Sequence, residues 1–153
     1  MKIAKNSNTQ LNAQKKNRDV ARQVNPEHYT FGLVECITFN RFMPYSIGCA
    51  FKYLWRLGRK DDETIELGKI SWYVRDSLKF RPRPTINAEF ADVLIRELSL
   101  MEDEFEHEVY KMLVGLISAA AGDFELLECL AEEYGFLNDA PIAANQEVYV
   151  SEA

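Results

Sequence analysis

The chain has 153 residues, of which 47% are hydrophobic, and a formal net charge of −6 at pH 7. This length is enough for one sizeable hydrophobic core and too short for two full domains. No run approaches the length of a membrane helix, and the N-terminus lacks the apolar core of a signal peptide, so we expect a soluble, cytoplasmic protein without membrane contact. The three cysteines form no CxxC pair, so neither a zinc site nor a disulfide framework is predicted.

The charge is distributed unevenly along the chain. Residues 1–24 contain six Lys or Arg and one acidic residue, residues 25–83 contain ten and seven, and residues 84–153 contain two and sixteen. An anionic small molecule is therefore expected to bind in the N-terminal half, whereas the acidic C-terminal half would repel a long nucleic acid. We expect no long nucleic acid among the partners.

The N-terminal residues 1–24 are rich in Asn, Gln and Lys and poor in large apolar residues, which predicts a flexible basic arm. The Asn-Pro pair at 25–26 favours extended backbone, so residues 27–29 are predicted to form an ordered edge rather than the middle of a helix. A first helix is predicted over about residues 32–42, and Glu35 lies on it.

Two helices joined by a charged turn follow between about residues 47 and 80. In the first helix, apolar residues at helical spacing predict a buried stripe of Ile47, Ala50, Phe51, Leu54 and Leu57. Basic residues recur every four positions on another face and predict a cationic ridge beside the buried stripe, made of Lys52, Arg56 and Lys60. Gly58 is suited to end this helix, and Asp61 or Asp62 to cap the next one.

The second helix of the pair is also amphipathic. Its inward face is predicted to carry Leu67, Ile70, Val74 and Leu78, and a neighbouring polar face to carry Glu66, Lys69, Tyr73 and Asp76. The sequence RPRPT after Phe80 is expected to end this helix. The seam between the two helices would then be lined by Lys, Arg, Glu and Tyr side chains.

The C-terminal half shows further apolar stripes at helical spacing, over about residues 90–101, 105–120 and 124–134. No strand is predicted, so the expected fold is all-α, a compact bundle of about six helices with disordered N- and C-terminal tails. We expect residues 25–80 to form its core, residues 81–137 to form an acidic helical region that packs on this core, and residues 138–153 to form a flexible tail.

The basic residues of the helix pair stand close in sequence to aromatic residues, namely Tyr53, Trp55, Trp72 and Tyr73. Cations together with flat aromatic faces suit a phosphorylated, ring-bearing ligand. The plain alternatives are that the charges only face water, where ion pairs contribute little, and that the aromatic rings belong to the core.

Four sequence features occur in a specific order: NPEHY at 25–29, Glu35, GCAFKYLWRLGRK at 48–60 and ELGKISWYV at 66–74. They resemble the small phage nucleotide kinases, a family without a P-loop that was long catalogued as a domain of unknown function. The usual family pattern is a Pro-x-His-Tyr start, a Gly-Asn-Ala-x-Lys-Tyr-x-x-Arg helix and an Asp-Leu-x-Lys-Ala-x-Trp-Tyr helix. Cys49 replaces the usual Asn, Glu66 the usual Asp and Ile70 the usual Ala.

The resemblance implies phosphoryl transfer from a nucleoside triphosphate to a deoxynucleoside monophosphate, dTMP or dGMP, in the host cytoplasm if a phage encodes the chain. It implies a catalytic set of His28, Lys52, Arg56, Glu66 and Lys69, and a substrate-binding set of Tyr29, Glu35, Tyr53, Lys60, Trp72 and Tyr73. Mg²⁺ can accompany the triphosphate, whereas no metal site made of protein ligands is predicted. A homo-oligomer is expected.

Two other functions stay open. The chain has no GxxxxGK[ST] loop, so a kinase of this sequence would have to align and neutralise phosphates with Lys and Arg on helices. Glu63 and Glu66 resemble the Mg²⁺-binding carboxylate pair of all-α nucleoside triphosphate pyrophosphohydrolases, but Tyr73 stands where the second acidic pair would begin. The other alternative is a non-enzymatic phage protein that binds a host factor through its acidic helices.

Overall fold

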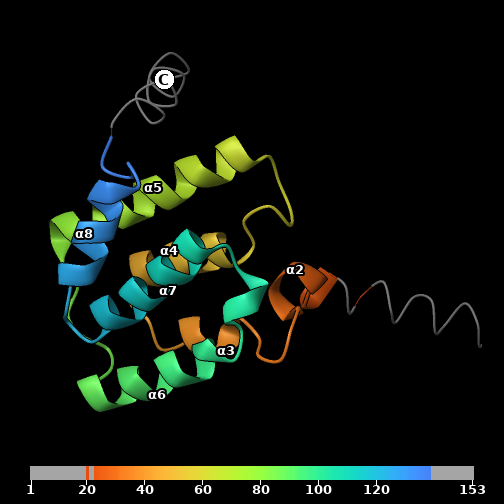
Figure 1. Ribbon diagram of the computed structural model, residues 1–153, viewed down its shortest axis with the longest axis horizontal. Helices are drawn as coiled ribbons and strands as arrows, with labels where there is room; N and C mark the ends of the chain where they lie inside the picture. The colour runs from red at the N-terminus through yellow and green to blue at the C-terminus, as the bar shows by residue number, and fades with distance from the viewer. Residues whose placement is uncertain (1–19, 21–22, 139–153) are drawn as a thin grey trace, which may run out of the picture.

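The computed structural model in Figure 1 is all-α, as the sequence predicts. It describes residue 20 and residues 23–138, so most of the predicted basic arm and nearly all of the predicted tail lie outside the described residues. Within the described part there is no strand, and the helices are α2 (Glu27–Thr30), α3 (Ile37–Asn40), α4 (Tyr45–Trp55), α5 (Glu63–Phe80), α6 (Ala88–Ser99), the 3₁₀ helix η1 (Glu102–Glu104), α7 (His107–Ala120) and α8 (Glu125–Glu133).

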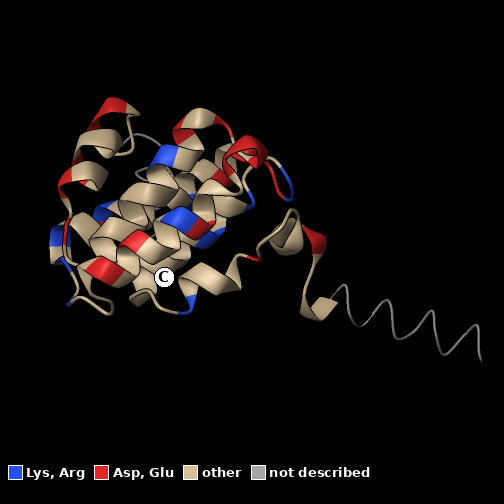
Figure 2. Cartoon of the chain, turned by 60° about the horizontal axis from the view of Figure 1, so that its bottom comes forward, with Lys and Arg blue, Asp and Glu red and all other residues tan. Residues whose placement is uncertain are grey.

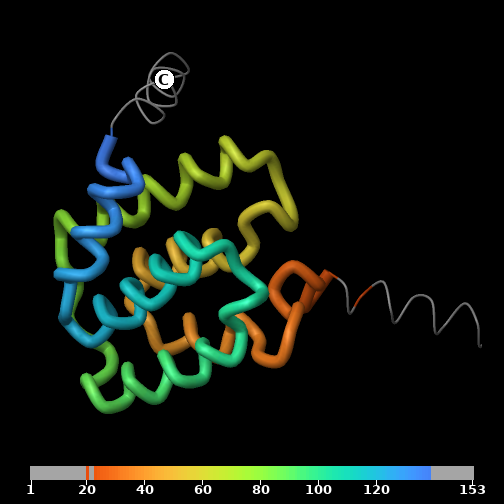
Figure 3. The backbone as a smooth tube through the Cα atoms, in the orientation of Figure 1, coloured from red at the N-terminus to blue at the C-terminus, as the bar shows by residue number. Residues whose placement is uncertain are grey.

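Helices α4 and α7 lie at the centre of the bundle, and the other helices are arranged around them (Figures 1 and 3). Helix α5 packs on α4, while α6 and α8 pack on α7. The core takes apolar side chains from both halves of the chain, and its largest fully buried members include Phe39, Phe51, Trp55, Met112, Leu116 and Ile117. The predicted packing of an acidic C-terminal region on the N-terminal helices therefore corresponds to the contact between α4 and α7.

Local sequence signals explain the ends of the central helices. Pro44 precedes α4, and Gly58 takes a φ of +77° in the turn that follows it, a conformation that glycine adopts without a steric cost. The Asp62 carboxylate caps α5 by accepting hydrogen bonds from the backbone N–H groups of Thr64 and Ile65, at 2.9 and 3.3 Å. Helix α5 ends at Phe80, directly before the RPRP sequence.

Three local predictions in the N-terminal half are wrong. Residues 27–30 form the helix α2, because Pro26 restricts the residue before it and leaves the residues after it free to be helical. The helix predicted over residues 32–42 is limited to α3, since Gly32 takes a φ of +79°, and Glu35 lies in the turn before α3. Helix α4 ends at Trp55, so Lys60 belongs to the α4–α5 turn and the cationic ridge does not reach it.

The surface is charged on many sides. Figure 2 shows Asp and Glu residues spread over several helices, with Lys and Arg residues between them. None of the described helices combines the length and the apolar character that crossing a membrane requires.

Candidate functional site

A buried ion pair joins α4 to α5. The Arg56 guanidinium, at the C-terminal end of α4, donates from Nε to Oε2 of Glu66 at 2.8 Å and from Nη2 to Oε1 at 2.9 Å. Arg56 is 5% exposed and Glu66 is fully buried. Two parallel hydrogen bonds between a guanidinium and a carboxylate are the strongest arrangement such a pair can adopt.

The prediction that Arg56 and Glu66 lie on solvent-facing polar faces is therefore wrong. The helix ends at Trp55 and α5 folds back over α4, so that the two side chains face each other between the helices. Burial alone would raise the pKa of Glu66, but hydrogen bonds from Arg56 and Lys69, together with their charges, hold its pKa below the usual value. Glu66 therefore stays ionised at neutral pH.

Helix α2 joins this pair through Tyr29. The phenol oxygen of Tyr29 accepts a hydrogen bond of 2.7 Å from Nη1 of Arg56. On the other side, Nζ of Lys69 donates to Oε1 of Glu66 at 3.2 Å. Side chains from α2, α4 and α5 thus form one connected network around the Arg56 guanidinium.

Three cations surround the ring of Tyr53, and we call these four residues the cationic cluster. Nζ of Lys52, the Arg56 guanidinium carbon and Nζ of Lys69 lie 4.8, 4.6 and 5.2 Å from the ring centroid. Each of these distances is within the range of a cation–π contact. Glu66, together with Asp61, whose Oδ2 atom lies 3.7 Å from Nη2 of Arg56, offsets two of these three positive charges, so the cluster keeps a net positive charge that suits an anion.

Tyr53 also continues into an aromatic layer. Its ring stacks on Tyr73, with a centroid distance of 5.8 Å and an interplanar angle of 20°. The rings of Trp72 and Tyr73 are nearly perpendicular, with 5.0 Å between their centroids, and Trp72 is 45% exposed. Burial, followed by a hydrogen bond with Tyr45, raises the pKa of Tyr73 to about 12, so its hydroxyl remains protonated. Trp55 differs from these residues because it is fully buried in the core.

A pocket of about 480 Å³ opens beside the cationic cluster, between α2, α3 and α4; we call it the α3 pocket. It is lined by Val24, Asn25, Tyr29, Glu35, Cys36, Ile37, Asn40 and Lys52. Its size falls within the range of about 300–1,000 Å³ that is usual for small-molecule sites. Burial raises the pKa of the Cys36 thiol to about 12, so this side chain is a neutral, apolar part of the wall. Tyr29 and Lys52 belong both to the pocket and to the surroundings of Arg56.

His28 lies on α2 next to Tyr29, with a distance of 4.3 Å between the ring centroids. Its Nε2 atom is buried without a hydrogen-bond partner among the described residues. Burial, and then the charges of Lys60 and Arg56, lower the pKa of His28 below its usual value. The imidazole is therefore neutral at pH 7 and can accept a proton.

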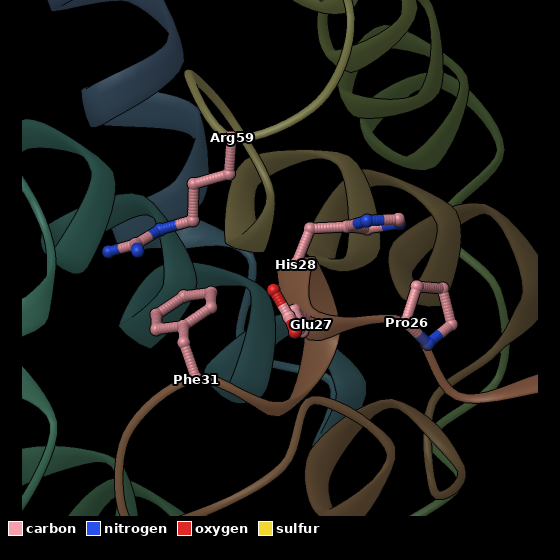
Figure 4. A pocket seen from close by; sticks show the side chains of 5 residues that line it. All are labelled: Pro26, Glu27, His28, Phe31 and Arg59. Atoms are coloured by element: carbon pink, nitrogen blue, oxygen red, sulfur yellow. The ribbon is translucent and has the colours of Figure 1, made fainter. Parts of the chain in front are cut away.

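His28 also lines a second, more open pocket of about 720 Å³, together with Pro26, Glu27, Phe31 and Arg59. Figure 4 shows that the His28 ring and the Arg59 guanidinium point to opposite sides of this pocket. The guanidinium lies over the Phe31 ring, 3.5 Å from its centroid, and donates a hydrogen bond to the carbonyl oxygen of Glu104. Arg59 and His28 thus do not converge on one point.

The structure brings most of the predicted site residues together. Tyr29, Lys52, Tyr53, Arg56, Glu66, Lys69 and Tyr73 form one continuous group, and His28 and Glu35 adjoin it through Tyr29 and the α3 pocket. Lys60 and Trp72 lie at its margin. Lys60 is exposed in the α4–α5 turn, and its positive charge contributes to the lowered pKa of His28.

Sequence reasoning missed two amide side chains in the α3 pocket. Asn25 Nδ2 donates a hydrogen bond to Glu35 Oε2 at 3.3 Å. Asn40 lies three and four residues after Ile37 and Cys36, so helical spacing places all three on one side of α3. A helix pattern read for polar as well as apolar residues would have found Asn40.

The two acidic residues at the start of α5 are unequal. Glu63 is exposed in the first turn, whereas both oxygens of Glu66 accept hydrogen bonds from Arg56 and Lys69. A metal ion held by Glu63 and Glu66 together would have to break the buried ion pair. Among the described residues there is no group of three or more His, Cys, Asp or Glu side chains that could hold a metal ion.

The comparisons with known proteins give one match. Residues 24–75 match the model of a family described only as proteins of unknown function, DUF3310. The matched segment runs from the residue before Asn25 to the middle of α5 and contains all eleven residues of the predicted catalytic and substrate-binding sets. Neither the curated proteins nor the solved structures contain a match.

Proposed function

We propose that the chain is a nucleotide kinase without a P-loop, which transfers a phosphoryl group from a nucleoside triphosphate to a deoxynucleoside monophosphate such as dTMP or dGMP. The observation that carries this proposal is the position of the cationic cluster beside the α3 pocket, with Lys52 common to both. The type of reaction is inferred from the resemblance of the sequence to small phage nucleotide kinases. The pocket would take the nucleoside part of the acceptor, and the cluster its phosphate.

In this reaction a phosphate oxygen of the monophosphate attacks the γ-phosphorus of the triphosphate. The bond between the γ-phosphorus and the bridging oxygen breaks, and a second nucleoside diphosphate leaves. Such a transfer depends mainly on the alignment of the two phosphates and on positive charge around the moving group. Lys52 and Lys69 would supply this charge, and Mg²⁺ would enter as the counter-ion of the triphosphate substrate.

The other residues of the network have positioning roles in this proposal. The Arg56 guanidinium already binds Glu66 and Tyr29, so it orients the Tyr29 ring at the mouth of the α3 pocket. Glu66 in turn holds the Lys69 ammonium group next to Tyr53. His28 packs beside the Tyr29 ring with its Nε2 atom buried, so it too has a positioning role.

The experiment that tests the proposal is product analysis with purified protein. Each deoxynucleoside monophosphate is incubated with a triphosphate and Mg²⁺, and the nucleotides are separated by anion-exchange chromatography. We expect both nucleoside diphosphates in equal amounts. Pyrophosphate released from triphosphate alone would instead indicate the pyrophosphohydrolase, and the absence of any product would contradict both enzyme functions.

A pair of lysine variants on α5 connects the activity to this site. Lys69→Ala removes a cation of the cluster, whereas Lys79→Ala removes an exposed cation at the C-terminal end of the same helix. Losing a hydrogen bond to a charged group costs about 1.5–3 kcal/mol, so the rate with Lys69→Ala should fall by at least about tenfold. Lys79→Ala should retain the parental rate, and equal activity of the two variants would place the reaction elsewhere.

A further inference from the structure

An apolar groove lies between the α4–α5 turn, the start of α7 and the end of α8. It consists of two adjoining hollows of about 530 and 380 Å³, which share five of the residues that line them. An open hollow with an apolar floor is suited to receive the apolar face of another segment. The side chains of this floor include Leu54, Leu57, Leu67, Val109, Met112 and Phe136.

Exposed acidic residues form the rim of this groove. Glu63 and Glu108 lie in the first turns of α5 and α7, where they favour the helix dipoles, but like charges around one hollow also repel each other. Among the lining residues, Arg59 and His107 are basic, and the Arg59 guanidinium is turned toward Phe31. A cationic segment would relieve the repulsion. The rim carboxylates are those of Glu63, Asp103, Glu104, Glu106 and Glu108.

The chain contains a segment with the complementary character. Residues 15–24 read KKNRDVARQV and contain four Lys or Arg and one Asp. Residue 20 and residues 23–24 of this segment are described, and they are helical. Val20 and Val24 are 51% and 78% exposed, and a spacing of four places them on the same helix face. An apolar face flanked by cations matches an apolar floor flanked by carboxylates.

We propose that residues 15–24 of one copy of the chain dock into this groove on a second copy. The two valines would lie against the apolar floor, and the four basic side chains would lie near the rim. The exposure of both valines within their own chain favours a second copy over docking in the same molecule. Two copies can exchange the segment symmetrically, which gives a closed dimer and does not depend on the proposed reaction.

The C-terminal residues 139–153 also lie outside the described part, and they follow Phe136 closely in sequence. They contain three acidic residues and no Lys or Arg. The acidic rim would therefore repel them. Charge complementarity selects the N-terminal segment as the occupant.

The first test measures the dimer by sedimentation velocity, with two matched pairs of variants in the full chain. The triple variant Glu63→Gln, Glu106→Gln, Glu108→Gln neutralises the rim, and its control is Glu89→Gln, Asp92→Asn, Glu97→Gln at exposed positions of α6. Figure 1 shows α5 and α6 on opposite sides of the α4–α7 pair. Val20→Ser removes an apolar anchor, and its control is Val93→Ser at an exposed position of α6.

We expect a dimer of the parent at low salt that dissociates as the salt concentration rises from about 0.05 to about 0.5 M, because salt screens exposed charges. The rim variant should raise the dimer dissociation constant by about tenfold, since each exposed ion pair contributes little alone and three are lost. Val20→Ser should also weaken the dimer. Both control variants should dimerise like the parent.

A second test identifies the contact and the copy that supplies it. Equal amounts of unlabelled and ¹⁵N-labelled protein are mixed and coupled with a carbodiimide, which joins a lysine amine directly to a carboxylate. We expect peptides that link Lys15 or Lys16 to Glu106 or Glu108, and half of them should combine one labelled and one unlabelled chain. The acidic residues of α6 should give few such links.

Four results would overturn the inference. These are a parent that stays monomeric at low salt, equal weakening by the rim variant and its control, links that never combine the two isotopes, and links distributed evenly over the exposed acidic residues. Links within single chains alone would assign the groove to the segment of the same molecule. If the rim variant does not fold, Val20→Ser decides the matter, because its substitution lies outside the groove.

Discussion

Arg56 and Glu66 depend on each other, because each is buried and each supplies the charge that the other needs. Removing one partner of such a pair leaves an uncompensated buried charge, which costs about 3–5 kcal/mol. We therefore expect Arg56→Ala to lower the free energy of unfolding by this amount, as measured by urea denaturation. This differs from the small effect that a solvent-facing Arg56 would have.

Two further variants make this prediction specific. Lys60→Ala removes an exposed cation from the neighbouring turn, where substitutions usually change stability by under about 0.5 kcal/mol. The double variant Arg56→Met, Glu66→Leu replaces the pair by apolar side chains and should recover much of the stability lost in Arg56→Ala. If the double variant were as unstable as Arg56→Ala, the loss of stability would come from the lost hydrogen bond between Arg56 and Tyr29 rather than from the unpaired charge of Glu66.

The lowered pKa of Glu66 predicts an acid-sensitive fold. The unfolded carboxyl titrates near pH 4.3 and the folded one below that, so the stabilisation is fully present above about pH 4.3 and is lost as the pH falls through the folded pKa. We expect Glu66→Gln to reduce the difference in unfolding free energy between pH 7 and pH 3. Glu63→Gln, at an exposed position on the same helix, should leave this difference nearly unchanged.

For single residues, the sequence predicted which side chains form the site better than it predicted what each of them does there. Spacing along α4 and α5, together with the motif resemblance, selected the residues that meet around Tyr53. It could not show that Arg56 is buried, because this depends on where α4 ends and on the angle at which α5 returns over it. Asn40, which lines the α3 pocket, was missed because the sequence around it was read for apolar residues alone.

Among the secondary-structure elements, the contact between α7 and α8 depends on a glycine. A Cβ atom at Gly115 would lie 3.3 Å from Cα and 3.4 Å from N of Leu127 on α8, and both of these are backbone atoms. Gly115→Ala should therefore push the helices apart and destabilise the protein by about 1–3 kcal/mol. Gly68→Ala, inside α5 with no atom within 4 Å of the new methyl group, should instead stabilise it by about 0.5–1 kcal/mol.

Urea denaturation of both glycine variants checks this prediction. The two substitutions make the same chemical change and gain the same helix propensity, so the difference between them measures the close approach alone. Equal stabilisation in both would show that α8 can move away from α7 without loss of packing.

The longer helices were predictable from the sequence, whereas the short N-terminal elements were not. Helices α5, α6 and α7 carry long apolar stripes and clear stop signals, such as the RPRP sequence after Phe80. Helices α2 and α3 have four residues each, too few to establish a period, and tertiary contacts hold them in place. One of these contacts is the hydrogen bond between Tyr29 and Arg56.

For the whole molecule, the shared core predicts a single folding unit. The fully buried Trp55 ring packs against Phe39 and Phe51 from its own half of the chain and against Phe105, which precedes α7, with a centroid distance of 5.0 Å to the latter. We expect circular dichroism and tryptophan fluorescence to give the same unfolding midpoint in urea. Separate transitions would mean that the two halves fold independently.

Truncation of the chain also tests whether the protein is a single folding unit. A fragment that ends at residue 83 keeps the segment matched by the family model but loses α7, the partner of α4. Without α7, the buried face of α4 would be open to water. We expect this fragment to be unfolded, with a red-shifted tryptophan emission, and a folded fragment would contradict the single core.

The pairing of Arg56 with Glu66 also constrains how this protein can change over evolutionary time. A mutation that removes either charge is harmful until the other partner changes too, so the two positions cannot drift independently. The charges of Lys52 and Lys60 are not tied to a buried partner in this way, since Lys52 is partly exposed and Lys60 is exposed. In chains that descend from a common ancestor with this one, the charges at positions 56 and 66 should therefore be kept together or lost together, whereas an exchange of Glu for Asp at position 66 keeps the charge and is allowed.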